Sequence, residues 1–576
     1  MKKLYREEYP RPSFVRDKWL NLNGEWEFEI LNKPENRLGK TLSQSIEVPF
    51  CPESNLSGIG YTGFMKNLWY RRTFEISRET LSGRVILHFG ACDYETTVYI
   101  NNKFVGKHIG GYVSFSFDIT DYSVVGENTL DVEVYDDTVN PEIPSGKQSI
   151  EEKSFGCFYT RTTGIWQTVW LEFVNNEYIK NAYIKPDCDN EKVDFELELN
   201  GGEYVLANLL YKGKEIGFEK QMIDSPNLKM SVKVNSPLLW EPGNPVLYDI
   251  VLKVFKNGKV TDTVKTYCGF RKFELKDRKL YLNGKPLFLR QILDQGYYPD
   301  GIYTAKTLDE LYNDIDIAMA LGFNGARPHQ KIFEEHYLYY ADKKGYIVWG
   351  EFPSWPGEFT KENPKLVENS ISEWCEEVIR DRNHPSIMGW APLNEAYHNH
   401  KTDLESQKRI YDATKELDDR IVVAASGGHH FVTDIFDIHY YSDNPEEVKS
   451  ILKNGVILWK SELSPEAMSI EELRKLPMFY SEYGGACYPP AAVGEFSTSA
   501  WGYYSTKTED EFINSYLAIT NAIFESDAIG YCYTQLTDVE QEHNGLYYYD
   551  RSCKFSPEGM KKIKLCNSQK KINKEV

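Results

Sequence analysis

The sequence IMGWAPLNE at residues 387–395 joins a short, wholly apolar run to an asparagine and a glutamate. Such a run is typical of a strand that is buried on both faces, as in a parallel sheet covered by helices. Polar side chains that directly follow such a strand lie at its carboxyl end, where parallel sheets carry their chemistry. We therefore expect residues 387–391 to form a parallel strand, with Asn394 and Glu395 at its rim.

Apolar runs of this kind alternate with helical patterns from residue 273 to the end of the chain. In the clearest helix, which starts after Lys306, Thr307 and Glu310 form a capping box and Gly322 follows the last turn. The eight predicted strands are 287–292, 323–326, 346–349, 387–391, 421–424, 435–439, 478–480 and 529–533. Eight such strands predict a (β/α)₈ TIM barrel over residues 273–576, with a doubly wound open sheet as the alternative.

The chain before residue 273 has a different texture, with short strands and turns and no long amphipathic helix. In one example Leu130, Val132 and Val134 alternate with polar neighbours, as in a strand buried on one face. This pattern predicts a β-sandwich of the jelly-roll kind over residues 1–180. Residues 181–272 are the right length for an immunoglobulin-like β-sandwich. We therefore expect three domains.

A second carboxylate follows the seventh predicted barrel strand in the sequence FYSEYGG at residues 479–485. The 87 residues from Glu395 to Glu482 leave room for the fifth and sixth βα units, so both side chains can reach one centre. Glycoside hydrolysis requires such a pair, because the leaving oxygen needs a proton and the oxocarbenium-like centre needs a negative charge or a nucleophile. At about 5–5.5 Å the second carboxylate attacks directly and the configuration is retained.

Several motifs in order along the chain resemble those of glycoside hydrolase family 2, which includes β-galactosidases and β-glucuronidases. Its two barrel signatures resemble DRNHPSIMGW at residues 381–390, followed by Asn394 and Glu395, and NGARPH at residues 324–329. The sugar-binding jelly roll of the family is similar to LNGEW at 22–26, WYRRTF at 69–74 and GIWQ at 164–167. The resemblance spans nearly the whole chain and implies the same three domains.

The resemblance also implies roles for individual residues. Glu395 would be the acid/base and Glu482 the nucleophile, while Asn394 would hold the sugar 2-hydroxyl. Tyr440 is similar to the family tyrosine that hydrogen-bonds the nucleophile, and Tyr441 is the competing candidate. The implied activity is that of a retaining exo-glycosidase acting on a terminal β-linked sugar.

Other polar residues also follow predicted strands. Arg327 could donate to the nucleophile and His329 to a sugar hydroxyl, with a buried ion pair as the alternative role. Asp294 after the first strand, and Gln535 and Asp538 after the eighth, could grip ring hydroxyls. Helix capping is the alternative role for these three residues.

The choice of sugar rests on motifs that the sequence lacks. The Asn-x-Lys pair with which β-glucuronidases hold the uronate carboxylate is missing from QEHNGLY at residues 541–547, so a neutral sugar is favoured. The magnesium-binding run of large β-galactosidases is missing from VWGEFP at 348–353, so we expect no required metal and no cofactor. A β-glucuronidase, β-mannosidase or arabinosidase, and a non-catalytic carbohydrate-binding protein, remain alternatives.

Composition limits the other partners. The net charge of −20 opposes binding to nucleic acid or to anionic membranes. The sequence contains no run of about 18 consecutive apolar residues, the length that a membrane-spanning helix needs. The basic start lacks the apolar segment of a secretion signal, and the ten cysteines form no C-x-x-C pair. We expect a cytoplasmic protein that binds carbohydrate; a homo-oligomer is compatible with this sequence.

Overall fold

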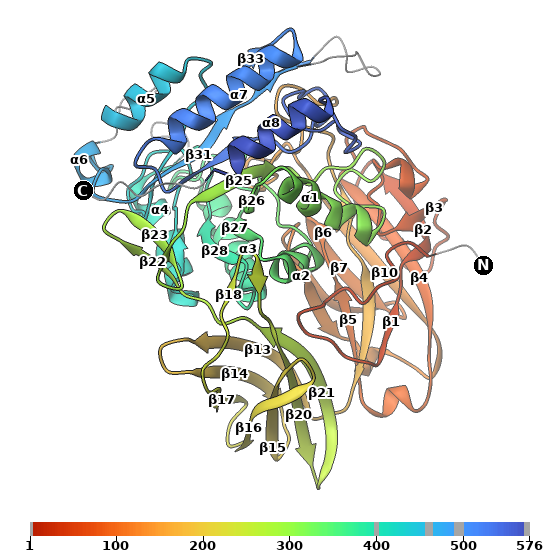
Figure 1. Cartoon of the computed structure of the whole chain (residues 1–576). Helices are drawn as coiled ribbons and strands as arrows, with labels where there is room; N and C mark the ends of the chain where they lie inside the picture. The colour runs from red at the N-terminus through yellow and green to blue at the C-terminus, as the bar shows by residue number, and fades with distance from the viewer. Residues whose placement is uncertain (1–3, 397–401, 455–464, 489–499, 570–576) are drawn as a thin grey trace.

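The computed structural model describes residues 4–396, 402–454, 465–488 and 500–569. Two β-sandwiches precede a barrel of alternating strands and helices (Figure 1). Each unit has its own buried apolar cluster, and the barrel cluster also takes in residues of the first sandwich. The three predicted fold types are therefore confirmed.

The first sandwich consists of two antiparallel sheets that enclose an apolar core. Leu130, Val132 and Val134 of β10 point into this core, as their alternation predicts. Asp131 is buried too, and Arg71 on the neighbouring strand compensates its charge by donating to it at 2.7 Å. One sheet has the order β1(Trp19–Asn21), β12(Val169–Val174), β5(Arg84–Phe89), β9(Phe115–Asp118); the other has β3(Gln44–Val48), β2(Gly24–Leu31), β4(Asn67–Ile76), β10(Gly126–Tyr135), β7(Glu95–Ile100), β8(Lys103–Ile109).

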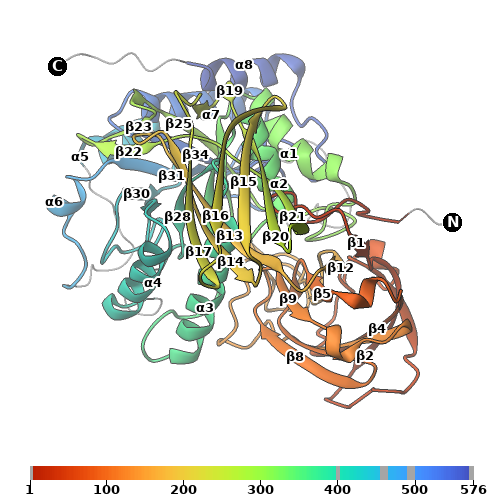
Figure 2. The ribbon, with the colours of Figure 1, turned by 90° about the horizontal axis from the view of Figure 1, so that it is seen from below.

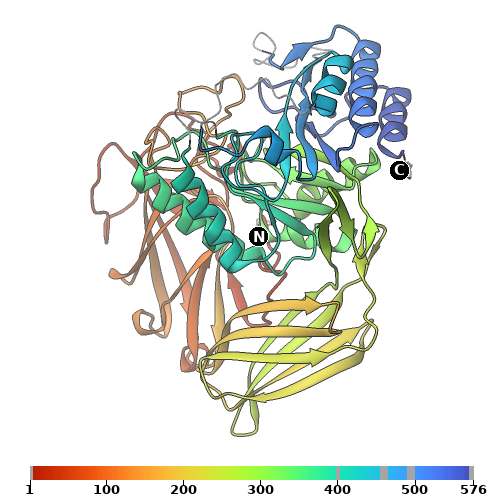
Figure 3. The same cartoon turned by 90° about the vertical axis from the view of Figure 1, so that its left-hand side faces the viewer.

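The second sandwich is smaller and projects from the barrel as a separate layered unit (Figure 3). Its strands are long and alternate cleanly, as in β14 and β20, whose inward side chains form one core. The three-stranded sheet is β13(Tyr178–Asp187), β14(Lys192–Asn200), β17(Asn227–Lys233), and the four-stranded sheet is β16(Lys214–Met222), β15(Tyr204–Tyr211), β20(Tyr248–Lys256), β21(Lys259–Cys268).

The barrel contains all eight predicted strands in one parallel sheet. Around the barrel they are β29(Ile421–Val422), β28(Ile387–Ala391), β27(Ile347–Glu351), β26(Gly325–Pro328), β25(Leu289–Asp294), β34(Gly530–Thr534), β31(Met478–Gly484) and β30(Phe436–His439). Asp434 N donates to Val422 O at 3.0 Å across the seam between β30 and β29. A small sheet of β22(Phe273–Lys276), β23(Lys279–Leu282) and β24(Lys285–Pro286) precedes the barrel, and its Leu280 packs with residues at the strand starts.

Helices connect the barrel strands and cover them from outside (Figure 1). In α1 the side chain of Thr307 caps Glu310 N, as predicted, while the Glu310 carboxylate reaches back to Lys306 N. The helices are α1(Leu308–Ala320), α2(Glu335–Lys344), α3(Pro364–Asp381), α4(Leu404–Leu417), α5(Pro445–Asn454), α6(Ile470–Leu473), α7(Glu509–Phe524) and α8(Pro557–Asn567). None of these helices, within the described part of the chain, is long and apolar enough to cross a membrane.

A loop of the first sandwich reaches the carboxyl end of the barrel. Figure 2 shows this sandwich, in orange, lying beside the barrel. Gly146 N in the loop donates to Trp355 O at 2.8 Å, and the Tyr159 hydroxyl donates to Glu542 at 2.5 Å. The polar rim predicted from the barrel strands is therefore completed by residues from another domain.

Candidate active site

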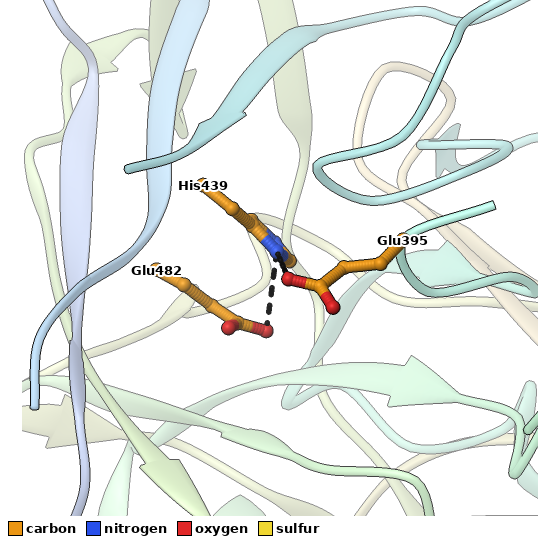
Figure 4. Close-up of side chains that lie close together, drawn as sticks. All are labelled: Glu395, His439 and Glu482. Carbon is orange, nitrogen blue, oxygen red and sulfur yellow. Dashed lines mark hydrogen bonds and ion pairs between the residues drawn. The ribbon is translucent and has the colours of Figure 1, made fainter. Parts of the chain in front are cut away.

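Two carboxylates from distant parts of the chain converge at the carboxyl end of the barrel. Glu395 lies four residues beyond the end of β28, and Glu482 lies near the end of β31. One oxygen of each lies, with a nitrogen of His439, in a group whose atoms are all within 4.8 Å of one another (Figure 4). The Glu482 side chain is 3% exposed and that of Glu395 is 19% exposed. The convergence expected from the two strand ends is therefore present.

The backbone turns sharply to present Glu395. Its φ of 47° is in the left-handed region, which residues other than glycine seldom adopt. Glu395 N donates to Ser426 O at 2.7 Å, and Ser426 N donates to Leu393 O at 2.8 Å, so the loop after β29 holds the turn. Such a conformation costs on the order of 1–3 kcal/mol and persists where neighbours impose it, often at functional sites.

Arg327 at the end of β26 joins the groups of the site. Its Nη1 donates to Glu482 at 2.7 Å, its Nη2 donates to Asn394 Oδ1 at 2.6 Å, and its Nε donates to Glu351. Burial lowers the pKa of Arg327, but the charges of Glu351 and Glu482 outweigh it and raise the pKa above its ordinary value. A permanent positive charge therefore faces Glu482.

Asn394 is oriented by the same arginine. Because a guanidinium can only donate, its contact with Oδ1 leaves the amide NH₂ as the donor that Asn394 can offer to a ligand. The backbone is fixed by Ser354, whose hydroxyl accepts from Asn394 N at 3.1 Å, and by Trp355, whose Nε1 donates to Asn394 O at 2.9 Å.

His329 is buried and bonded to a carboxylate that lies beside Glu482. Its Nδ1 lies 2.8 Å from Glu351 Oε1 and 4.0 Å from Glu482 Oε1. Burial lowers the pKa of His329 well below its ordinary value, so the ring is neutral near pH 7. Glu351 also accepts from Gln330 N at 3.0 Å, which makes it the support of both Arg327 and His329.

The tyrosine that contacts Glu482 is Tyr441, and the expectation for Tyr440 is wrong. The Tyr441 hydroxyl donates to Glu482 Oε2 and lies 3.2 Å from Thr534 Oγ1. The Tyr440 hydroxyl donates instead to Glu447 at 2.6 Å. Successive side chains of an extended segment alternate in direction, so Tyr440 turns away when its neighbours His439 and Tyr441 face the site.

Three further candidates make hydrogen bonds within the fold. Asp294 accepts from Gly296 N at 3.0 Å and from the Tyr337 hydroxyl at 3.3 Å. Burial raises the pKa of Asp294 to about 7, which opposes a charged role in sugar binding. Gln535 Oε1 accepts from Gln295 at 2.7 Å.

Asp538 belongs to a buried ion pair. Its Oδ1 accepts from Lys554 Nζ at 2.6 Å and from Gly545 N at 2.9 Å. These contacts stabilise the loops around the barrel mouth, and the expectation that Asp294, Gln535 and Asp538 grip ring hydroxyls stays a prediction. None of these contacts is a helix cap.

The first sandwich contributes a cation and an aromatic ring, Lys147 and Phe158, that sequence reasoning missed. Lys147 Nζ lies 4.4 Å from the centre of the Trp355 ring, and the Phe158 ring is 5.6 Å from the same tryptophan. Burial lowers the pKa of Lys147, but Cys157 and the carboxylates of Glu542, Glu482 and Glu395 outweigh it and raise the pKa above its ordinary value. No spacing rule connects this lysine with barrel residues more than 200 positions later, so only the fold reveals it.

Glu395, His439 and Glu482 are also spaced closely enough to hold a metal ion, and no other such group of histidine, cysteine and acidic residues occurs among the described residues. Arg327 Nη1, however, lies 2.7 Å from Glu482 Oε1. A fixed positive charge at this position opposes a second cation. The donor set therefore fits proton transfer and nucleophilic attack better than metal binding.

Comparisons with known proteins agree with this architecture. Residues 61–174 match the sugar-binding domain of the glycosyl hydrolases family 2, residues 177–271 match a further model described simply as glycosyl hydrolases family 2, and residues 273–565 match the TIM-barrel domain of that family. A β-glucuronidase from Ruminococcus gnavus, solved with an N1-substituted uronic isofagomine, superposes with a TM-score of 0.77 at 19% identity. That likeness covers 98% of this chain and 100% of the solved one.

Curated relatives have two kinds of activity in their names. A β-galactosidase of Thermoanaerobacter pseudethanolicus is 27% identical over 65% of this chain and 50% of its own length. A putative β-glucuronidase of Formosa agariphila is 29% identical over 57% of this chain and 40% of its own length. The chain thus matches half or less of the length of these two relatives. With family models covering all three domains, the chain belongs to family 2 of the glycosyl hydrolases.

Proposed function

We propose that this protein is a retaining exo-glycosidase that hydrolyses a terminal β-linked sugar by double displacement, in the manner of a β-galactosidase. The separation of the two carboxylates carries the proposal, because oxygens of Glu395 and Glu482 lie within 4.8 Å of each other. Retaining enzymes need about 5–5.5 Å between the carboxyl groups, whereas inverting enzymes leave about 6.5–9.5 Å for a water molecule. The short separation supports direct attack by one carboxylate.

The surroundings of the two carboxylates support different roles. Glu482 is nearly buried and accepts from both Arg327 and Tyr441, so two donors orient its carboxylate, as a nucleophile requires. Glu395 is the more exposed of the two and follows Asn394, whose amide would hold a sugar hydroxyl in this proposal. We therefore assign the nucleophile to Glu482 and the acid/base to Glu395.

The reaction would proceed in two displacements. In the first, a Glu482 oxygen bonds to the anomeric carbon, the glycosidic bond breaks, and the proton of Glu395 passes to the leaving oxygen. In the second, water attacks the same carbon, gives its proton to Glu395 and releases Glu482 as a carboxylate. Two inversions at one carbon retain its configuration.

Charged residues beside Glu395 and Glu482 favour some sugars over others. Glu542 is a buried carboxylate close enough to interact with Glu482, and it accepts hydrogen bonds from Tyr159 and Asn544. A uronate carboxylate near Glu542 would meet like charge, which favours a neutral sugar such as galactose. The cation of Lys147 favours a β-glucuronide as the second candidate, while a β-mannoside and an arabinoside remain weaker alternatives.

The decisive experiment combines a panel of nitrophenyl glycosides with trapping by 2-deoxy-2-fluoro glycosides. We expect turnover of the β-galactoside, and a fluoroglycosyl adduct on the peptide that contains Glu482, detected by mass spectrometry. The E482Q variant, checked for folding by circular dichroism, is the control and should form no adduct. Absence of turnover and of adduct for every sugar would refute the enzyme and favour a carbohydrate-binding protein; an adduct on Glu395 would reverse the roles.

A matched pair of variants tests the correction at positions 440 and 441. Tyr441→Phe should lower kcat/KM about 10- to 100-fold, since a hydrogen bond to a charged group contributes about 1.5–3 kcal/mol. Tyr440→Phe removes a hydroxyl that contacts Glu447 and should leave kcat/KM nearly unchanged. Equal losses in the two variants would show that Tyr441 has no special relation to the nucleophile.

A further inference from the structure

His439 lies between the two catalytic carboxylates. Its Nδ1 is 3.0 Å from Glu395 Oε1 and 3.5 Å from Glu482 Oε1, and its side chain is almost completely buried at the end of β30 (Figure 4). The ring therefore presents one nitrogen to both groups that react. Nothing in the roles assigned so far uses this contact.

The contacts of the second ring nitrogen, Nε2, indicate which nitrogen carries the hydrogen. Nε2 lies 3.2 Å from Arg327 Nη1, which can only donate, and 3.1 Å from Ser426 Oγ, which itself donates to Asp437 at 2.6 Å. The contact with Arg327 requires Nε2 to accept. In the neutral ring the hydrogen is then on Nδ1, where it faces Glu395 and Glu482. Burial lowers the pKa of His439, but Glu482 and Glu395 outweigh it and raise the pKa, and Nδ1 carries a hydrogen in the protonated ring as well.

We propose that His439 is a positioning residue whose Nδ1–H donates to whichever catalytic carboxylate is ionised. That carboxylate is Glu482 before the first displacement and Glu395 between the two displacements. This inference rests on the proposed function, since it concerns the same two carboxylates. It adds a residue that touches both of them and that would act mainly in the second displacement, when Glu395 is the base.

The charge and proton balance explains why one donor can serve both states. At rest the pair carries one negative charge on Glu482 and one proton on Glu395. After the first displacement Glu482 is a neutral ester, and Glu395 has given its proton to the leaving group and carries the charge. Nδ1 keeps its hydrogen throughout and donates to Glu395 alone in this intermediate. A hydrogen bond to the ionised form stabilises Glu395 as a carboxylate and orients it toward water.

The test compares His439→Leu, which removes both ring nitrogens, with His439→Asn, whose amide can place a donor near the position of Nδ1. The probe is 2,4-dinitrophenyl β-galactoside, or the β-glucuronide if wild type prefers that sugar. This leaving group needs no acid, so kcat/KM reports the first displacement and kcat reports the second. Azide, which attacks without a base, is added in parallel.

We expect His439→Leu to lower kcat about tenfold or more while kcat/KM changes less than about threefold, so that KM falls with kcat. Azide should restore its kcat, and His439→Asn should recover most of the loss. The proposal is overturned if kcat and kcat/KM fall together, if azide has no effect, or if the asparagine variant behaves like the leucine variant. Failure of wild type to hydrolyse either probe would instead refute the proposed function.

Discussion

Replacing Glu482 with glutamine is expected to lower kcat by about 10⁵- to 10⁶-fold, the scale of loss seen when a covalent nucleophile is removed. The amide has the shape of the carboxylate but is a poor nucleophile, so the first displacement cannot form a glycosyl ester. Arg327 still donates to Glu351 and Asn394, which should keep the surrounding structure in place. Steady-state kinetics on the preferred nitrophenyl glycoside, with thermal unfolding followed by circular dichroism, measures both effects.

Glu447→Gln is the matched control for this variant. Glu447 accepts from Tyr440 and Ser442 near the same strand end but has no contact with Glu482, so kcat should stay close to the wild-type value. If purified E482Q kept activity within about tenfold of wild type, a loss far smaller than general acid–base effects alone produce, the nucleophile would have to be sought elsewhere.

The barrel could be predicted from sequence because each strand is a short apolar run between turns or helical patterns. All eight predicted strands are present, with ends that differ by a few residues. The largest difference is in β31, predicted as 478–480, which extends as Met478–Gly484 and therefore includes Glu482 itself. Apolar runs identify buried strands, but pairing with β30 and β34 determines where this strand ends.

The convergence of Glu395 and Glu482 was predictable for a similar reason. Glu395 lies four residues after one apolar run and Glu482 two residues after another, and the carboxyl ends of parallel strands meet at one rim. Arg327 was expected at the same rim because it follows the second predicted strand. The choice between Tyr440 and Tyr441 was not predictable in this way, because one residue of uncertainty in the strand end reverses which side chain faces inward.

Residues on the loops could not be assigned from sequence. Asp294 and Asp538 have the polarity of sugar-binding groups, but the structure satisfies them with Tyr337 and Lys554, and only the folded loops determine those partners. Lys147 lies in another domain. His439 is one histidine at a strand end, a pattern too common to indicate contact with two carboxylates.

Glu395→Gln is expected to have an effect that depends on the leaving group. With 4-methoxyphenyl glycosides, whose departure needs a proton, kcat/KM should fall about 10²- to 10⁴-fold. With 2,4-dinitrophenyl glycosides kcat/KM should change little, since that leaving group departs unprotonated. Their kcat should still fall, because water then lacks a base in the second displacement.

Azide distinguishes loss of the acid/base from a damaged site. The anion reacts with the glycosyl ester without giving up a proton, so it should raise kcat of Glu395→Gln on the dinitrophenyl substrate and yield a β-glycosyl azide identifiable by NMR. Glutamine also keeps an oxygen that can accept from His439 Nδ1, which preserves the local packing. Equal losses for both leaving groups, without azide rescue, would remove the acid/base role from Glu395. The retained β configuration of the azide would separately support attack from the face opposite Glu482, because only a covalent intermediate on that carboxylate directs the anion there.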